Sequence, residues 1–214
     1  MAQVTIWKGV QIAMQSAVAA AKDLTAITKA NPGVAACASH GYANGEYLRF
    51  KNVLGMYQVN NRIIRVAGQT TGNFNLEGED TTLYGTFVSG QVEKVTFGTT
   101  FSTFLDCSVT GGDFPQIDTT TIHDLQKSSQ PGMPNGLVIT SNNIWDVSDA
   151  ALIAAKKQSD AQTLSAFLVT FQNGQKFVIN GYIGCTLSPA GNAQEKVTTQ
   201  IVITGVGSPT VYAS

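Results

Sequence analysis

The stretch that most constrains this chain is 91–145, where two segments of strand-forming residues flank a long loop. Residues 91–110 are dominated by Val, Thr and Phe, which fit a pleated surface, and 137–144 resumes a similar composition. The loop between them, 111–136, far exceeds the roughly two to five residues of an ordinary hairpin loop. It carries too many Ile, Phe, Leu and Met residues for a disordered segment. We therefore expect an arm that leaves the sheet and contacts another molecule.

The composition also points to association. Only 13% of the 214 residues are charged, against about 25% in an average globular chain. A surface short of charge is poor at keeping a protein monomeric. Either copies of the same chain cover much of that surface, or this is a β protein coated with Thr, Ser, Asn and Gln.

Charge and cysteine content argue against several functions. The net charge is −1 and the 13 Lys and Arg residues form no run, so tight nucleic-acid binding is not expected. Cys37, Cys107 and Cys185 lie far apart, which argues against a disulfide framework and a zinc site and favours small apolar residues packed in strands. The chain has no Gly-x-Ser-x-Gly elbow. We expect no enzyme activity, no cofactor and no metal.

No membrane-inserting segment is expected. The first residues lack the basic start and apolar run of a signal peptide. The apolar stretch 12–21 is too short and too interrupted to cross a bilayer. The sequence therefore predicts a product of the cytoplasm that does not bind membranes and stays soluble until it assembles.

Short strands and turn signals set 24–79 apart from the rest of the chain. Strand-like segments recur about every ten residues, separated by turns such as Pro32-Gly33 and Asn44-Gly45. This pattern predicts a small antiparallel barrel or sandwich, inserted into a mainly β host domain made of 1–23 and 80–214. The host begins with a strand that has a phase slip at Gly9, and 14–22 could be strand or helix.

One helix and three strands are predicted to complete the host domain. Residues 146–160 begin with Asp and Ser capping candidates and carry an apolar stripe of Val147, Ala151, Leu152 and Ala155. Strands follow over 164–171, 176–187 and 194–204, with Asn173-Gly174 as the hairpin signal between the first two. The tail 205–214 is predicted to be an extended arm.

The inserted block resembles a small β module known from the first catalytic cysteine half region of ubiquitin-activating enzymes, also found in phage structural proteins. The matching residues are 27–32, His40-Gly41, Asn44-Gly45, Gly55-Met56, Asn60, Arg62, Asn73-Phe74 and Leu76. The resemblance implies a fold and no activity, because the chain has neither a nucleotide-binding Gly-rich loop nor a thioester cysteine in context.

The host domain resembles the major tail tube protein of long non-contractile-tailed phages. The segment 112–124 resembles that family's loop, and the helix, the Asn173-Gly174 hairpin, 181–183 and 202–205 follow in the family's order. The resemblance implies a structural virion protein of the tail, assembled in the bacterial cytoplasm. It implies hexameric rings that stack into a tube, work with tape-measure, tail-tip and terminator proteins, and let DNA pass during ejection.

The tube hypothesis gives two groups of residues a role. The loop would contact the next ring through Asp113, Phe114, Ile117, Asp118, Ile122, His123 and Asp124. A bore that DNA slides through should be polar and nearly neutral, so either Lys196, Thr198 and Gln200 or the matching face of 91–97 is expected to line it.

Alternatives remain for the loop residues and for the function. His123 and Asp124, beside Asp113 and Asp118, could form a metal or acid/base site, whereas Asp118, Thr119 and Asp124 could simply make local turn hydrogen bonds. Trp7 and Trp145 are expected in the core or a subunit interface. The alternative functions are a tail terminator, adaptor ring or baseplate protein, and a carbohydrate-binding adhesion protein.

Overall fold

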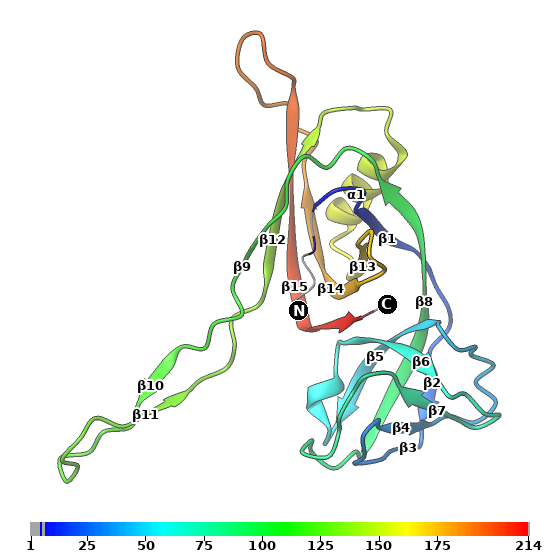
Figure 1. Cartoon of the computed structure of the whole chain (residues 1–214), viewed down its shortest axis with the longest axis vertical. Helices are drawn as coiled ribbons and strands as arrows, with labels where there is room; N and C mark the ends of the chain where they lie inside the picture. The colour runs from blue at the N-terminus through cyan, green and yellow to red at the C-terminus, as the bar shows by residue number, and fades with distance from the viewer. Residues whose placement is uncertain (1–4, 6, 214) are drawn as a thin grey trace.

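The protein consists of two β lobes and a projecting arm. The computed structural model describes residues 5 and 7–213; 46% of the chain is strand, and the described part contains a single α-helix. In Figure 1 the large lobe lies above, the small lobe lies below it on the right, and the arm runs to the lower left. The predicted mainly β fold class is confirmed.

The large lobe is a curled antiparallel sheet with the strand order β8-β1-β13-β14-β15-β12-β9. Its strands are β1 (Gln11–Val18), β8 (Ser89–Phe101), β9 (Ser108–Thr110), β12 (Val138–Ile144), β13 (Ser165–Thr170), β14 (Lys176–Cys185) and β15 (Thr198–Tyr212). Alternate side chains of these strands point into the curl, where Met14, Phe167, Ile179 and Ile201 are buried. The sheet thus encloses its own core.

The helix α1 (Ala150–Ala161) closes one end of this core with Ala151, Leu152 and Ala155. It begins later than predicted, because Asp149 is its N-cap and accepts a hydrogen bond from the amide of Leu152 at 2.8 Å. Asp146 instead closes a preceding turn by accepting from Ser148. Val147, predicted on the apolar stripe, lies outside the helix and is exposed.

Three strand predictions need correction. The ambiguous segment 14–22 is strand in its first part, and the bulge lies between Met14 and Ala17 rather than at Gly9. The predicted strand 91–110 stops at Phe101, after which the chain crosses to β12 and Phe104 bridges Asn143. The last strand begins at Thr198 rather than at residue 194 and continues through most of the tail predicted as an extended arm.

The small lobe is an antiparallel row that closes on itself. Its elements are β2 (Lys22–Leu24), β3 (Ala26–Ile27), β4 (Val34–Ala36), β5 (Tyr47–Leu54), the 3₁₀ helix η1 (Tyr57–Val59), β6 (Ile63–Ala67) and β7 (Asn73–Leu76). The order is β3-β4-β7-β6-β5-β8, and β2, one residue before β3, pairs with β8 at the other end. The row therefore forms a small barrel around Phe50, Met56 and Phe74. The core of the small lobe also contains Val92 of β8, which lies outside the range 24–79. The domain boundaries at 24 and 79 stay predictions. The resemblance of this block to the module of ubiquitin-activating enzymes also stays a prediction.

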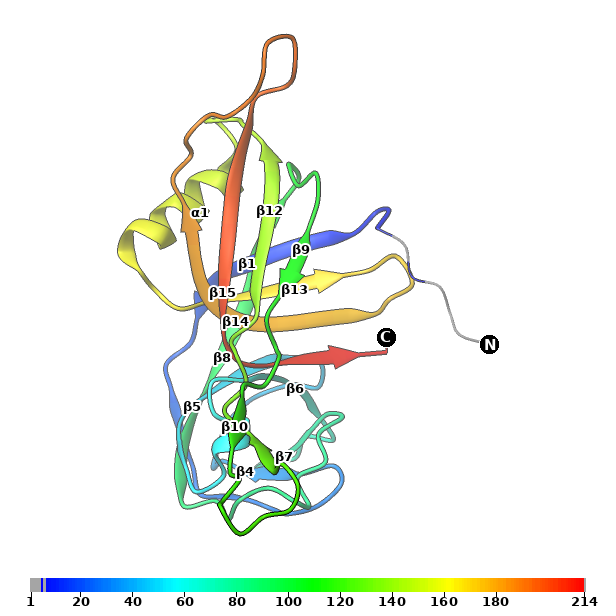
Figure 2. The ribbon, with the colours of Figure 1, turned by 90° about the vertical axis from the view of Figure 1, so that its left-hand side faces the viewer.

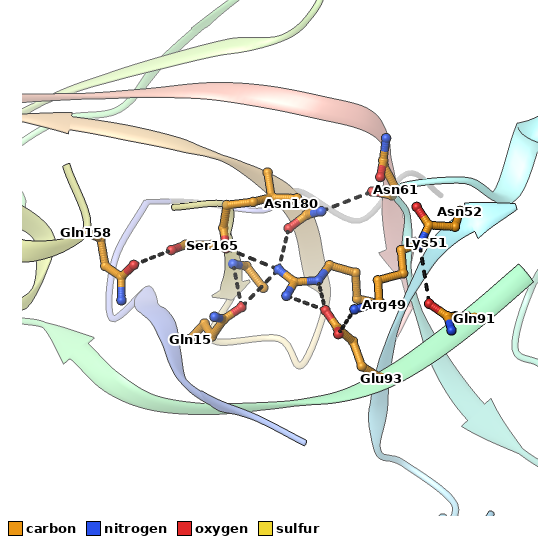
Figure 3. Close-up of polar contacts among 12 residues, drawn as sticks. Gln15, Arg49, Lys51, Asn52, Asn61, Gln91, Glu93, Gln158, Ser165 and Asn180 are labelled. Atoms are coloured by element: carbon orange, nitrogen blue, oxygen red, sulfur yellow. Dashed lines mark hydrogen bonds and ion pairs between the residues drawn. The ribbon is translucent and has the colours of Figure 1, made fainter. Parts of the chain in front are cut away.

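The strand β8 joins the lobes, because its first half pairs with β5 and its second half with β1 (Figure 1). Beside it, the Arg49 guanidinium forms an ion pair with buried Glu93. The same guanidinium donates to Gln15 at 3.3 Å, the carbonyl of Leu164 at 3.2 Å and Asn180 at 3.4 Å, all in the large lobe (Figure 3). One small-lobe side chain thus holds three segments of the large lobe.

The end of β15 forms the second half of this junction. The Tyr212 hydroxyl accepts from the amide of Arg65 at 2.7 Å, and the Arg65 guanidinium lies 4.5 Å from the Tyr212 ring centroid. Thr210 donates to the carbonyl of Ile63. Burial raises the pKa of Tyr212 to about 12. The C-terminal segment, which was predicted as an extended arm, therefore attaches the small lobe to the large one.

Candidate assembly surfaces

The arm is a β ribbon, not an irregular loop. Within 111–136, β10 (Gln116–Asp118) pairs antiparallel with β11 (Ser129–Pro131). Backbone hydrogen bonds continue the pairing toward the base, from Asn135 to Asp113 at 2.9 Å and from Gly132 to Pro115 at 2.7 Å. Figures 1 and 2 show that the ribbon points away from both lobes. The pairing holds the two sides of the arm together, and the side chains of the arm are almost all exposed.

The arm carries large apolar side chains in solvent. They are Phe114, Ile117, Ile122, Leu125 and Met133. Ile122 is 96% exposed and Leu125 is 102% exposed, both in the tip. Contiguous exposed apolar side chains mark a surface that another molecule covers. The arm therefore exposes apolar side chains, and a contact of its residues with the next ring stays a prediction.

The carboxylates of the arm are occupied by local hydrogen bonds. Hydrogen bonds from the hydroxyl and amide of Thr120 lower the pKa of Asp118, and those from the amide and hydroxyl of Thr121 lower the pKa of Asp124. Asp113 accepts from the Asn135 side chain at 3.2 Å near the base. The interpretation as turn-forming residues is confirmed for Asp118 and Asp124.

Nothing in the described part of the arm resembles a reactive centre. His123 is exposed and only its backbone amide takes part in the turn, donating to Thr121 at 3.3 Å. Among the residues that the structure describes, no group of three His, Cys, Asp or Glu side chains could hold a metal ion. The described arm residues offer exposed apolar side chains and locally hydrogen-bonded carboxylates.

The residues predicted to line a bore lie on or beside one sheet face. Thr198 and Gln200 point to the outer side of β15, opposite Ile144 and Asn142 of β12, and Lys196 is exposed in the preceding loop. This face is polar and nearly uncharged. The alternative face of 91–97 is different, because Glu93 and Val95 on it are buried at the junction. Thr96 of the same segment is exposed and Lys94 is half-buried, so which of the two faces lines a bore stays a prediction.

The two tryptophans have different surroundings. Trp145 is partly buried and donates from Nε1 to the carbonyl of Leu187 at 2.8 Å. Trp7 is 59% exposed and packs edge-on against Phe171, with ring centroids 5.4 Å apart. The prediction of a core or interface position thus fits Trp145 in part, whereas Trp7 lies at the surface. No sequence pattern predicted the packing of Trp7 against Phe171.

The cysteines are unpaired in the structure. Cys37 and Cys185 are buried and Cys107 is half-buried. Burial raises the pKa of all three thiols. A raised pKa keeps a thiol protonated and poorly nucleophilic, so these side chains act as packing residues.

The exposed apolar side chains of the arm are typical of a surface that another molecule covers. Comparison with known proteins gives the family. Residues 55–214 match the family described as phage tail tube protein, TTP, which is 160 of the 214 residues. The chain therefore belongs to the phage tail tube protein family and is a structural component of the virion tail.

The family match begins at Gly55, within the range predicted as an insert. No curated protein matches the chain. Among the described residues, no helix is long and apolar enough to cross a membrane.

Proposed function

We propose that this chain assembles into hexameric rings that stack into the tail tube, through which DNA passes into the host. The observation that carries the proposal is the family match over three quarters of the chain. Two structural features support it. The arm presents apolar side chains beyond the body of the molecule, and the edge strand β9 has a partner on one side only among the described residues.

These features suit different contacts. A free strand edge invites pairing with a neighbouring sheet, and closing several sheets into a ring removes the edges. A head-to-tail contact that does not close produces a filament, which is how rings stack. The arm, with Asp113, Phe114, Ile117, Asp118, Ile122, His123 and Asp124, would make the contact between rings.

The neutral face of β15 suits the bore. DNA that meets few Lys or Arg side chains releases few counterions and is not held. Thr198 and Gln200, with Lys196 as the single cation of the group, would let it slide. Tape-measure, tail-tip and terminator proteins would set the length and the ends, and assembly would take place in the bacterial cytoplasm.

Electron microscopy of negatively stained protein, across a concentration series and beside sedimentation velocity, tests the proposal. We expect hollow filaments with a regular ring repeat above a critical concentration, or on addition of purified tail-tip complex. Closed rings that never stack under either condition would contradict tube formation and favour a terminator or adaptor.

A further inference from the structure

The large lobe has an apolar groove at the end opposite α1. Its volume is about 630 Å³, within the roughly 300–1,000 Å³ of pockets that enclose a ligand. The floor consists of core residues such as Phe167 and Ile179, and the rim includes Trp7, Phe171 and Val211. Val211 is 72% exposed, although its side chain lines the groove. The described residues thus leave an apolar groove over this end of the core.

The groove and the arm have complementary surfaces. Lys176 is the one charged residue among the described residues that line the groove, and Lys8 beside Trp7 is exposed. The arm, 111–136, contains three Asp residues and one Lys, so its formal charge is 1 − 3 = −2 with His neutral. An anionic strand with apolar side chains fits an apolar groove with a cationic rim.

The arm cannot fill the groove of its own chain. The groove opens beside the β13–β14 turn and the end of β15, which point to the right in Figure 2, whereas the arm leaves toward the viewer and downward. The paired backbone of the arm would have to bend back on itself to return. An arm that occupies the groove must therefore belong to another copy of the chain.

We propose that the arm tip of one copy, with Ile122 and Leu125, inserts into the apolar groove of a second copy, where Lys176 faces the carboxylates of the arm. This inference rests on the proposed function and deepens it by naming the receiving site. The arm and the groove are different surfaces, so the contact is head-to-tail and each copy can give one arm and receive another. Repetition of this contact extends a filament.

Photo-crosslinking maps the contact directly. Leu125 is replaced by the photoreactive p-benzoylphenylalanine, and cross-linked peptides are identified by mass spectrometry. We expect intermolecular crosslinks to peptides containing Trp7, Phe171 or Val211. The same probe at Leu83, which is 93% exposed in the segment between β7 and β8, serves as the control and should not reach these peptides. Crosslinks from position 125 to other surfaces only, or only within one chain, would overturn the proposal.

Two variants separate the giving and receiving surfaces. The arm variant is Ile122→Asp with Leu125→Asp, and the groove variant is Val211→Asp. Since these side chains are exposed, thermal unfolding should match the wild type, as should that of Leu83→Asp. Alone, the groove variant with the photoprobe at position 125, and likewise Ile122→Asp with the same photoprobe, should each lose at least about tenfold in crosslinked dimer, the scale expected when an apolar contact is replaced by a charge.

A mixture of the two variants gives the sharpest outcome. The groove variant keeps an intact arm and the arm variant keeps an intact groove, so photoprobe-labelled groove variant should crosslink to the arm variant. The mixture should not form long filaments, because no subunit can both give and receive. Failure of the mixture to recover the crosslink would contradict arm-in-groove docking.

The same experiment distinguishes the two proposals. Wild-type filaments whose crosslinks avoid the groove would leave the tube function standing and remove the groove as receptor. Arm-to-groove crosslinks in a protein that never forms filaments would support the docking and contradict the tube.

Discussion

At the residue scale, the buried ion pair of Arg49 and Glu93 best explains how the two lobes keep their orientation. Burial acts to raise the pKa of Glu93, but hydrogen bonds and charges from Lys51 and Arg49 outweigh it and hold the pKa below its ordinary value of 4.5. The carboxylate therefore stays ionised in the folded chain. The Arg49 guanidinium also donates hydrogen bonds to the large lobe. The junction between the lobes therefore needs both members of the ion pair.

Substitution of one partner should destabilise the chain. Arg49→Met leaves Glu93 buried with only Lys51, and we expect a loss of about 3 kcal/mol in the free energy of unfolding, measured by urea denaturation. The double variant Arg49→Met with Glu93→Leu should recover most of that loss, because no unpaired charge stays buried. A double variant as unstable as the single one would show that shape, rather than charge, matters at the junction.

The depressed pKa of Glu93 also predicts a pH dependence. Its stabilising effect is present above the unfolded pKa near 4.5 and is lost as the pH falls through the folded pKa, because the unfolded state then binds more protons. Urea denaturation between pH 6 and about pH 3 should show stability falling in the wild type. The slope should be shallower in Glu93→Gln, and equal slopes would assign the acid sensitivity to other carboxylates.

At the element scale, the arm is separable from the fold that carries it. The arm strands β10 and β11 pair only with each other. The β9–β12 pairing of Thr110 with Val138 lies in the large lobe, where the arm begins and ends. The strands are short, and the ribbon depends on local hydrogen bonds such as those of Asp118 and Asp124. The exposed apolar side chains of the arm belong to none of the core clusters of the described residues.

Replacing 112–136 by Asn-Gly should join β9 to β12 by a two-residue hairpin turn. Because the removed side chains are almost all exposed, the free energy of unfolding should change by less than about 1 kcal/mol. Sedimentation velocity should show a monomer at concentrations where the wild type associates. Filaments formed by the armless chain would contradict a role of the arm in stacking.

At the scale of the whole molecule, the two sides of the assembled protein should differ in accessibility. In a tube, the outer face of β15 would be turned into the bore and the small lobe outward, since a second barrel would block the bore. Gln200 and Leu83 are both exposed in the single chain and mark these sides.

Cysteine labelling tests that arrangement. Gln200→Cys should react with a bulky maleimide in the monomer and lose most of its reactivity in filaments, whereas Leu83→Cys should react in both. The wild type supplies the background, which should be low because its thiols are buried or half-buried. Equal labelling of Gln200→Cys in filaments and monomers would place this face outside the bore.

The sequence by itself determined the features that depend on local pattern and composition. Alternating Val, Ile and Phe predicted the strands β12, β13 and β14 to within a few residues, and Asn173-Gly174 predicted the turn between the last two. The length and apolar content of 111–136 predicted a projecting arm. Charge content excluded a basic DNA-binding surface. These signals are short-range, so each can be read where it occurs.

Only the tertiary structure decided what depends on distant segments. The tail 205–214 was predicted as an extended arm, and its partners lie far away in the sequence: β15 runs on to Tyr212, and Tyr212 and Thr210 form hydrogen bonds with the small lobe. Both Asp146 and Asp149 are capping candidates in the sequence, and the structure shows that Asp149 is the N-cap. The groove unites residues from Trp7 to Val211. No local sequence pattern predicts this groove, because its lining comes from strands that are far apart in the sequence.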